Sequence, residues 1–501
     1  MNLDPEQEKA VETTKGPLII TAGPGSGKTR VLVERILFLI QEGVPPEKIL
    51  ALTFTNKAAD EMRKRLEERT PSLPYISTFH SLAYDVISLH GALVEVPDAR
   101  KNFEDGLLNF DSLLSLLKEL FEKHDEVLRH YQERFCFISV DEYQDTNPVQ
   151  GDILRLLGAG HGNVCVIGDP NQAIYGFRGA TLENFFSFDA YFPNPMKISL
   201  SKNYRSHPSI HAAARLIFGD RISNGDPISC AGEYVSITSL PSDKDEVSYI
   251  LREVKRLIGG QDMRETDAGL LGSYHAGDIA ILYRLKAIGK EFARAFSHAG
   301  IPCQLVGEEN FFEKPEIREL LKYLQARDSS QNPPDAIRDI IREKGLQAKY
   351  DDSTPLGAQK YENILQLQTM AALYNSIESF LRYALLSRAE DVPLRNDAVT
   401  LMTAHASKGL EFPVVFVAGV EEGLFPYERS EDTEEERRLL YVAMTRAKER
   451  LYITHARRRM LFGKISERAP SPFLDAIPEN IVPRQTLLPK KKKGAAQARL
   501  L

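Results

Sequence analysis

Short apolar runs alternate along the chain with stretches of helical composition. In the first part of the chain, four runs each end in small or polar residues: PLIITAG (17–23), ILALTFT (49–55), FCFISVDE (135–142) and VCVIGD (164–169). Continuous apolar runs of this length are typical of strands that are buried on both faces of a parallel sheet. Because ligands bind at the carboxyl ends of the strands in such sheets, the polar residues that follow the runs are the first candidates for chemistry.

A second set of apolar runs occurs later in the sequence: DIAILYR (278–284), VTLMTAH (399–405) and PVVFVAG (413–419). Between the two sets, residues 224–227 and 259–277 are predicted to be loops. Residues 329–397 have a helical composition, and Asn332-Pro333-Pro334 opens this segment. The pattern therefore predicts the α/β fold class, with two α/β units and helical insertions.

The length and composition are those of a globular protein. The chain has 501 residues, of which 43% are hydrophobic and 27% charged, and a typical domain size of roughly 150 residues suggests about three domains. No apolar run approaches the roughly 18 residues that a membrane span needs. The polar N-terminus MNLDPEQEKA is unlike a secretory signal. We therefore expect a cytoplasmic protein with no membrane partner.

Charge and cysteine content change this picture only slightly. The net charge of −7 does not by itself indicate a nucleic-acid binder, although a local groove can be positive on an acidic protein. The basic block Lys490–Lys493 is interpreted as a disordered, solvated C-terminal tail, with nonspecific phosphate binding or contact with a protein partner as alternatives. The four cysteines form no CxxC pair, so we expect no metal–thiolate site. Cys136 and Cys165 lie in apolar runs and are predicted to be buried.

The strongest local motif is AGPGSGKT at residues 22–29, between an apolar run and the helical run RVLVERILFLI. A strand–loop–helix of this kind directs backbone N–H groups and a helix N-terminus at phosphate oxygens. The P-loop pattern starts with Gly, where this chain has Ala22, and the rest fits; the flanking elements favour this interpretation over an ordinary glycine-rich turn. Lys28 is predicted to reach the β and γ phosphates, and the Thr29 hydroxyl to bind Mg²⁺. The predicted phosphate-binding set is Ala22, Gly23, Pro24, Gly25, Ser26, Gly27, Lys28, Thr29 and Arg30.

An acidic pair at the end of a neighbouring strand is the expected partner of such a loop. Asp141 and Glu142 follow the run FCFISV and fit this position. Asp141 is predicted to hold Mg²⁺, and Glu142 to orient and deprotonate the attacking water. One acidic pair at a strand end is common, but together with the glycine loop it indicates hydrolysis of a nucleoside triphosphate.

The blocks around these two motifs resemble the UvrD/Rep family of superfamily 1 helicases. The resemblance covers almost the whole chain in nine blocks: LDPEQEKAV (3–11), TFTNKAADEM (53–62), STFHSL (77–82), VDEYQDTN (140–147), GDPNQAIYGFRGA (168–180), NYRS (203–206), LMTAHASKGLEF (401–412), EEERRLLYVAMTRAKERL (434–451) and MLFG (460–463). It implies two RecA-like P-loop domains, ATP and Mg²⁺ as cofactors, and single-stranded or tailed duplex DNA as the substrate. The blocks QAIYGFRGA and NYRS resemble the branch that moves 3′ to 5′. The expected divisions are residues 1–200 with an insertion at about 85–134, residues 201–470 with an insertion at about 325–396, and a C-terminal extension at 471–501.

The same resemblance assigns roles around the nucleotide. Gln7 would contact the adenine edge, Tyr204 would stack on the base, and Glu411 would lie near the ribose. Gln172 would sense the γ-phosphate and pass its state to the residues that contact DNA. Arg205 and Arg446 would act as arginine fingers, delivering positive charge to the γ-phosphate from outside its own domain.

Local pattern adds support for Arg446. Thr433 and Glu436 have the spacing of a capping box, which predicts a helix start. Leu439, Val442 and Ala443 then form an apolar stripe, and Arg446 takes its next helical position. A buried permanent charge at that position needs a partner, for which a structural salt bridge is the alternative to phosphate.

Aromatic residues are the expected grip on single-stranded nucleic acid. Tyr175 and Phe177 lie among Gly and Arg residues, which favours an exposed position for both. The family usually has Trp where Phe177 stands, and this chain contains no Trp. Taken alone, Phe54 and Phe462 would be interpreted as core residues. The full set that the resemblance places against nucleic acid is Phe54, Thr78, His80, Tyr175, Phe177, Tyr427 and Phe462.

Both inserted regions are shorter than in typical relatives. The sequence therefore supports translocation by the isolated chain more strongly than it supports unwinding of a duplex. Three functions remain open from the sequence: a 3′-to-5′ DNA helicase, a translocase that remodels protein–DNA complexes with little unwinding, and a regulatory ATPase that turns over ATP without nucleic acid. The sequence also leaves open the pathway, the preference for DNA over RNA, and the oligomeric state.

Overall fold

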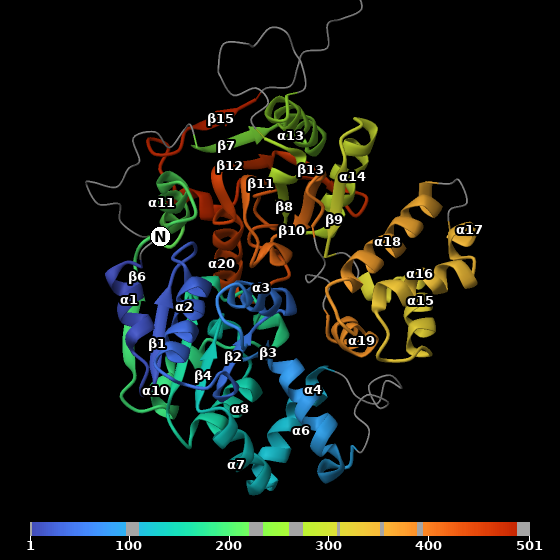
Figure 1. Ribbon diagram of the computed structural model, residues 1–501. Coiled ribbons are helices and arrows are strands. Elements are labelled where there is room, and N and C mark those ends of the chain that lie inside the picture. Colours follow the sequence, from blue (N-terminus) through green and yellow to red (C-terminus); the bar gives the residue numbers. More distant parts are fainter. Residues whose placement is uncertain are drawn as a thin grey trace, which may run out of the picture.

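The computed structural model describes residues 3–96, 110–219, 234–259, 274–307, 311–350, 355–387 and 394–487. Two parallel sheets lie one above the other, each covered by helices, and a group of helices stands to one side (Figure 1). We call the first sheet with its helices the first lobe, and the second sheet with its helices the second lobe. The predicted α/β fold class is confirmed.

The first lobe contains a six-stranded sheet in the order β3-β2-β4-β5-β1-β6, and all neighbouring pairs are parallel. Its strands are β1 Leu18–Ala22, β2 Ile49–Thr53, β3 Tyr75–Thr78, β4 Phe137–Val140, β5 Val164–Gly168 and β6 Met196–Leu200. The longer helices are α1 Pro5–Glu12, α2 Lys28–Gln41, α3 Asn56–Glu67, α4 Phe79–His90, α6 Phe110–Lys123, α7 Asp125–Arg134 and α8 Pro148–Gly158. All four predicted strands are present. The apolar-run pattern missed β3 and β6 because β3 is short and β6 alternates exposed and buried residues at the sheet edge.

The second lobe contains a seven-stranded parallel sheet in the order β15-β7-β12-β11-β8-β10-β9. Its strands are β7 Val235–Leu240, β8 Ile279–Tyr283, β9 Cys303–Val306, β10 Val399–Thr403, β11 Phe412–Ala418, β12 Ala447–Ala456 and β15 Arg484–Thr486. Its longer helices are α11 Pro208–Leu216, α13 Asp243–Leu257, α14 Lys286–His298 and α20 Thr433–Met444. The edge strand β15 comes from the segment expected to be a C-terminal extension.

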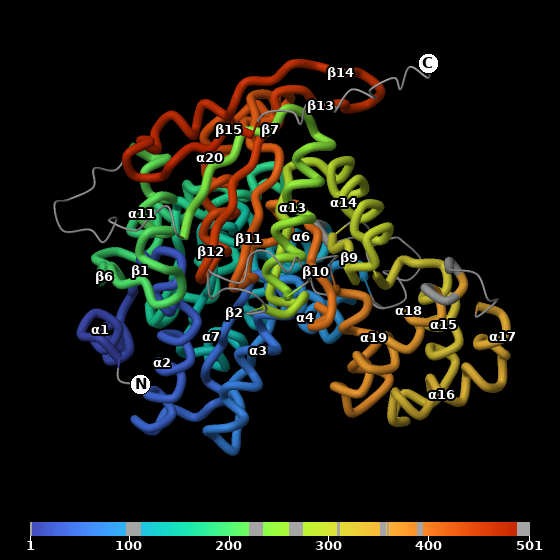
Figure 2. Tube along the Cα trace, turned by 90° about the horizontal axis from the view of Figure 1, so that it is seen from above, coloured from blue at the N-terminus to red at the C-terminus, as the bar shows by residue number. Residues whose placement is uncertain are grey.

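The side group of helices consists of α15 Pro315–Gln325, α16 Pro333–Glu343, α17 Leu346–Tyr350, α18 Pro355–Ala371 and α19 Ile377–Leu386. It has a hydrophobic core of its own, and both views show it standing away from the second sheet (Figures 1 and 2). Helix α19 contacts the first lobe, where Arg382 Nη2 donates to Asp85 Oδ2 at 2.6 Å. Asn56 Nδ2 donates to the Leu386 carbonyl at 2.8 Å. The helical group that is inserted in the second lobe therefore forms hydrogen bonds with the first lobe.

A short antiparallel hairpin extends from the second lobe beyond β12. It consists of β13 Arg458–Leu461 and β14 Lys464–Glu467 (Figure 2). Phe462, with a φ of 52°, and Gly463, with a φ of 78°, form its turn. The side chains of Met460, Phe462 and Ile465 are exposed, which places an apolar patch on this hairpin.

Some local predictions are wrong. Helix α20 begins at Thr433, but Asp432 is its N-cap and accepts from the N–H groups of the first turn. Glu436, the second member of the predicted capping box, instead forms a salt bridge with Arg284 at 2.8 Å.

Cys165 is buried as predicted, whereas Cys136 is only half-buried and donates to the Glu133 carbonyl.

Several sequence predictions concern residues outside the described ranges. The basic tail Lys490–Lys493, the predicted loop at 224–227 and most of 259–277 belong to this group. Within the described ranges, no helix combines the length and the apolar character that crossing a membrane requires.

Candidate functional site

The glycine loop joins β1 to α2 at the carboxyl edge of the first sheet. Gly25 and Gly27 have φ values of 72° and 85°, a left-handed backbone that glycine adopts without strain. A Cβ on Gly25 would lie 2.6 Å from the Arg205 Cβ, and a Cβ on Gly27 would lie 2.9 Å from the Gln7 Nε2. Both glycines are therefore required by backbone shape and by the close approach of predicted site residues. Helix α2 begins at Lys28, and the free N–H groups of its first turn face this loop.

Residues predicted to contact the base surround this loop. Gln7 is buried, and its Nε2 donates to the Ser26 carbonyl at 2.9 Å. The Tyr204 N–H donates to the Gly25 carbonyl at 2.8 Å, and the Tyr204 hydroxyl donates to Asp4 Oδ2 at 2.6 Å. The Tyr204 ring is 58% exposed, so one face is open to a ligand. The first helix and the NYRS segment thus meet at the phosphate loop.

The acidic pair lies at the end of β4, beside the loop. Thr29 Oγ1 is 3.5 Å from Asp141 Oδ2, and the Lys28 ammonium donates to the Ala22 carbonyl at 3.1 Å. Burial and the neighbouring Glu142 carboxylate raise the pKa of Asp141 to about 7. Burial opposes the ionisation of Glu142 too, but Lys28 and Lys408 outweigh it and lower its pKa to about 2. Glu142 is therefore the charged member of the pair.

The donor set fits a magnesium ion. Octahedral Mg²⁺ bonds to oxygen at about 2.1 Å, so two adjacent ligand oxygens lie roughly 3 Å apart. The Thr29 hydroxyl and the Asp141 carboxylate are close to this spacing. Among the described residues there is no cluster of three or more His, Cys, Asp or Glu side chains that could hold a metal ion.

Arg446 reaches the site from the second lobe. It lies just after the C-cap of α20 rather than within the helix, and it is buried. Its guanidinium donates to the carbonyls of Val442 at 2.9 Å and Leu410 at 3.1 Å, and its Nη2 lies 3.5 Å from the Gln172 Oε1 of the first lobe. Burial and the nearby positive charge of Arg205 lower the pKa of Arg446 to about 9. These hydrogen-bond partners are neutral, and the negative charges that act on the guanidinium are those of Glu142 and Glu411, with which it forms no ion pair.

Arg205 and Glu411 also meet between the lobes. The Arg205 Nε is 2.5 Å from Glu411 Oε2, and the Lys448 ammonium is 2.7 Å from Glu411 Oε1. Glu411 therefore carries two cationic partners, Arg205 from the NYRS segment and Lys448 from β12. The two predicted arginine fingers lie near enough to affect each other electrostatically.

Lys408 is a site residue that the sequence analysis did not single out, although it lies in the block LMTAHASKGLEF. Its buried ammonium pairs with Asp145 and donates to the Gln172 carbonyl at 2.5 Å, and it lies 3.9 Å from Glu142. The side chain thus crosses from the second lobe into the acidic centre of the first. Its local sequence carried no signal of this role, because only the fold brings positions 408 and 145 together.

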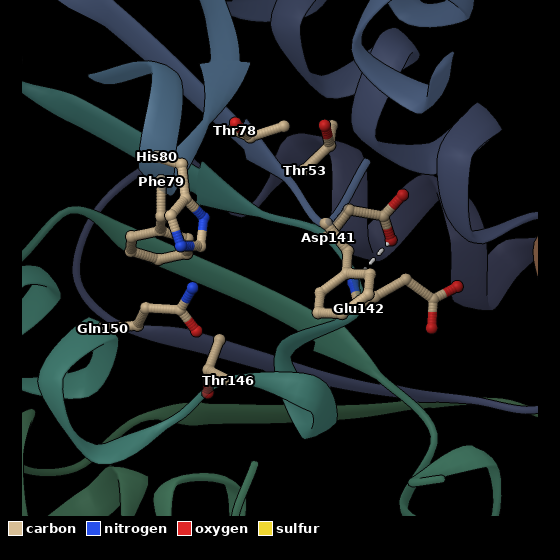
Figure 3. Close-up of a pocket in the computed structure, with 9 residues that line it drawn as sticks. Thr53, Thr78, Phe79, His80, Asp141, Glu142, Thr146 and Gln150 are labelled. Carbon is tan, nitrogen blue, oxygen red and sulfur yellow. Dashed lines mark hydrogen bonds between the residues drawn. The ribbon is translucent and has the colours of Figure 1, made fainter. Parts of the chain in front are cut away.

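The predicted nucleic-acid residues fall into four places: a small pocket, an open groove, the core of the second lobe and the turn of the hairpin. Phe54, Thr78 and His80 line a small pocket with Asp141 and Glu142 (Figure 3). In this view His80 and Phe79 lie on the side opposite the two carboxylates, with Gln150 and Thr146 below. This pocket thus places three of the predicted nucleic-acid residues beside the acidic pair.

Phe177 and Tyr427 line an open groove between the lobes. The Phe177 ring is 64% exposed and meets the His405 ring edge-on at 5.3 Å. Arg284 lies over the Tyr427 ring at 4.9 Å, and Arg178 also lines the groove. Burial and the charges of Arg284, Arg178 and Lys408 lower the pKa of His405 to about 3. Burial is the largest cause of this shift, and the groove lining carries charges of both signs: Arg178, Arg284, Lys286 and Arg429 beside Glu431, Asp432, Glu435 and Glu436.

The expectation that Tyr175 is exposed is wrong. Tyr175 is 4% exposed and stacks on Phe54 with ring centroids 4.8 Å apart. It packs with Ile174 into the hydrophobic core of the second lobe, which removes the ring from solvent. Phe462, taken alone, was predicted to be a core residue, and this prediction is also wrong. Phe462 is 76% exposed, on the hairpin turn and away from the groove.

Comparisons with known proteins agree with these blocks. A family model described as the UvrD/REP helicase N-terminal domain matches residues 3–105 and 99–193. A model described as the UvrD-like helicase C-terminal domain matches residues 198–348 and 341–458. The chain is 30% identical to the ATP-dependent DNA helicase PcrA of Staphylococcus aureus strain NCTC 8325 / PS 47, with 99% of this chain and 89% of the relative covered. It is also 30% identical to the protein of the same name from Staphylococcus epidermidis strain ATCC 12228, with 98% and 89% covered.

Proposed function

The chain belongs to the UvrD/Rep helicase family, and we propose on this basis that it is an ATP-dependent DNA helicase that moves 3′ to 5′ along single-stranded DNA. The observation that carries the proposal is the approach of Arg446 Nη2 to Gln172 Oε1 at 3.5 Å. One residue comes from each lobe, and the Glu142 carboxylate of the acidic pair acts electrostatically on Arg446. A nucleotide bound there would draw the lobes together, and its hydrolysis would release them.

The residues around the loop divide the chemistry of hydrolysis among them. Lys28 and the N-terminus of α2 would bind the phosphates, and Thr29 and Asp141 would hold Mg²⁺, which would supply positive charge to offset that of the phosphates. Glu142 accepts a proton from the attacking water. Arg205 and Arg446 stabilise the charge that develops on the γ-phosphoryl group. Because Arg446 is on the second lobe, hydrolysis depends on closure of the two lobes.

A continuous segment connects this chemistry to the groove. After Gln172, the Ala173 carbonyl accepts from Arg438 of α20 at 2.7 Å, and Tyr175 is buried against the second lobe. Phe177 then emerges into the groove. A shift of Gln172 with nucleotide state would therefore move Phe177 relative to a bound strand. This supports an aromatic grip that changes with each ATP cycle.

Measuring ATP turnover with and without single-stranded nucleic acid tests the proposal. We expect single-stranded DNA to stimulate turnover strongly, and a duplex with a 3′ single-stranded tail to be unwound in preference to one with a 5′ tail. Parallel reactions with RNA establish the nucleic-acid preference. Turnover that is the same with and without DNA and RNA would instead support a regulatory ATPase.

A second candidate is a translocase that removes proteins from DNA with little unwinding. The alignment with the Staphylococcus aureus relative spans 666 positions, more than the 501 residues of this chain, so the relative has segments that this chain lacks. Streptavidin displacement from biotinylated single-stranded DNA, measured beside unwinding of a forked duplex, separates the two functions. Displacement without unwinding favours the remodelling translocase.

Phe177→Ala tests the proposed grip. Loss of one stacked ring costs about 1–3 kcal/mol, so we expect the single-stranded DNA concentration that half-maximally stimulates ATP turnover to rise about tenfold. Phe186→Ala is the matched control, because Phe186 is 66% exposed on the first lobe and lies outside the groove. Equal DNA concentration dependence in both variants would remove Phe177 from the strand-binding surface. Tyr175 is unsuitable for this test, because its replacement would disturb a packed core.

A further inference from the structure

Gln144 is a fully buried side chain between the two acidic strand ends of the first lobe. It lies in the short 3₁₀ turn Tyr143–Asp145 that follows β4. Its Nε2 donates to Glu142 Oε2 at 2.6 Å and to Asp145 Oδ2 at 3.0 Å. Its Oε1 accepts from the Asp169 N–H at 2.9 Å. One amide thus contacts three polar groups from two strand ends.

The surroundings fix the orientation of this amide. A carboxamide has two N–H donors on one side and acceptor lone pairs on the other. Here the N–H donors face two carboxylates and the carbonyl oxygen faces a backbone N–H. In a flipped amide the oxygen would face the two carboxylates and the NH₂ group would face the N–H, so all three hydrogen bonds would be lost. Neither a shorter nor an apolar side chain would satisfy all three partners.

The backbone of β5 is shaped to admit Gln144. A Cβ on Gly168 would lie 2.4 Å from the Gln144 Oε1, so any larger residue at position 168 would displace the amide. The next residue, Asp169, accepts from Gln172 Nε2 at 2.6 Å through its Oδ2. A chain of contacts therefore runs from Glu142 through Gln144 and Asp169 to Gln172, which faces Arg446 of the second lobe.

We propose that Gln144 is a positioning residue for ATP hydrolysis, which fixes the Glu142 carboxylate and links its placement to the segment that carries Gln172. The inference rests on the proposed role of Glu142 as the base. The backbone does not fix the side-chain torsions of Glu142, so the direction of its carboxylate depends on contacts of the side chain itself. The amide contact supplies that restraint on one oxygen, and the other oxygen remains available to the attacking water.

The contacts from Gln172 through Asp169 to Gln144 also couple closure of the lobes to the position of the Glu142 carboxylate. Arg446 and Lys408 contact Gln172 from the second lobe, at the side chain and at the carbonyl respectively. Movement of the Gln172 segment displaces Asp169, and the Asp169 N–H holds the acceptor end of Gln144. Glu142 is therefore brought into place as the second lobe closes.

Gln144→Met is the direct test, because methionine has a similar length and none of the three hydrogen bonds. We expect kcat for ATP to fall about 30-fold while the dissociation constant of a fluorescent ATP analogue stays within about twofold. Gln132→Met is the control, since Gln132 makes a single hydrogen bond to the Leu156 carbonyl, between α7 and α8. A kcat for Gln144→Met within about twofold of the parent would overturn the proposal.

A double variant separates positioning from a general structural role. Because Gln144 acts through Glu142, the combination of Gln144→Met with Glu142→Gln is expected to be no slower than Glu142→Gln alone in single-turnover hydrolysis. A further loss equal to that of Gln144→Met would show an independent effect and overturn the inference. Normal hydrolysis by Glu142→Gln would instead remove Glu142 from its role, which is failure of the proposed function itself.

Gly168→Ala keeps the test decisive if Gln144→Met fails to fold. The added methyl group displaces the amide oxygen, its nearest contact, ahead of the Phe185 ring at 3.0 Å, so we expect the same selective loss of kcat with ATP binding retained. Unchanged kcat in Gly168→Ala would overturn the proposal.

Discussion

Glu142→Gln is expected to bind ATP and to lose hydrolysis almost completely. A carboxamide has nearly the shape of the carboxylate but accepts no proton, and loss of a general base costs about 10²–10⁴-fold in rate. The substituted side chain can still present an oxygen to Gln144 Nε2, which preserves the contact at 2.6 Å. Rapid-quench hydrolysis of radiolabelled ATP, beside equilibrium binding of the same nucleotide, measures the two properties separately.

Lys28→Ala is the matched control for that result. Lys28 is predicted to bind the phosphates directly, so its loss should weaken ATP binding and turnover together, whereas Glu142→Gln should affect turnover alone. Since Glu142→Gln holds ATP without hydrolysing it, we expect it also to retain single-stranded DNA binding in its ATP-bound form. Hydrolysis by Glu142→Gln at the rate of the parent chain would contradict the assignment of the base.

The sequence was sufficient for the core of the fold because local pattern and global structure agree there. Each of the seven predicted apolar runs forms a parallel strand, and the polar residues that follow β1, β4 and β5 meet at one sheet edge. This follows from parallel topology alone, since all strands present their carboxyl ends on the same side. The order of apolar runs along the chain was therefore enough to predict that the phosphate loop and the acidic pair are neighbours.

The features that the sequence did not reveal depend on contacts between distant segments. Tyr175 stands among Gly and Arg residues, yet it is buried because the second lobe covers it. The place of Lys408 in the site became evident only from its contact with Asp145, which lies 263 positions away in the sequence. Glu436 has the spacing of a capping residue but pairs with Arg284, leaving the cap to Asp432. In each case a tertiary contact replaced the local interaction that the pattern suggested.

Arg446 combines a buried charge that has no ion-pair partner with a direct link between the lobes. Its guanidinium is buried, and Arg205 adds a second positive charge nearby. A salt bridge was the alternative interpretation, but none of the ion pairs found among the described residues involves Arg446. Three neutral oxygens from Val442, Leu410 and Thr445 orient the guanidinium without neutralising it. A polyanionic phosphate bound at the loop would relieve the repulsion between the two arginines.

Arg446→Lys is therefore expected to reduce ATP hydrolysis by about 10³-fold with little change in ATP affinity, because arginine fingers contribute roughly 10³–10⁵ to rate and lysine lacks the planar fork. The affinity for ADP with fluoroaluminate, which mimics the transition state, should fall far more than the affinity for ATP. Arg437→Lys is the control, since Arg437 lies on α20, the helix that Arg446 follows, but donates to the Ile217 carbonyl within the second lobe. If Arg446→Lys bound the fluoroaluminate complex as tightly as the control, Arg446 would act only in packing the second lobe, and closure would need another source of positive charge.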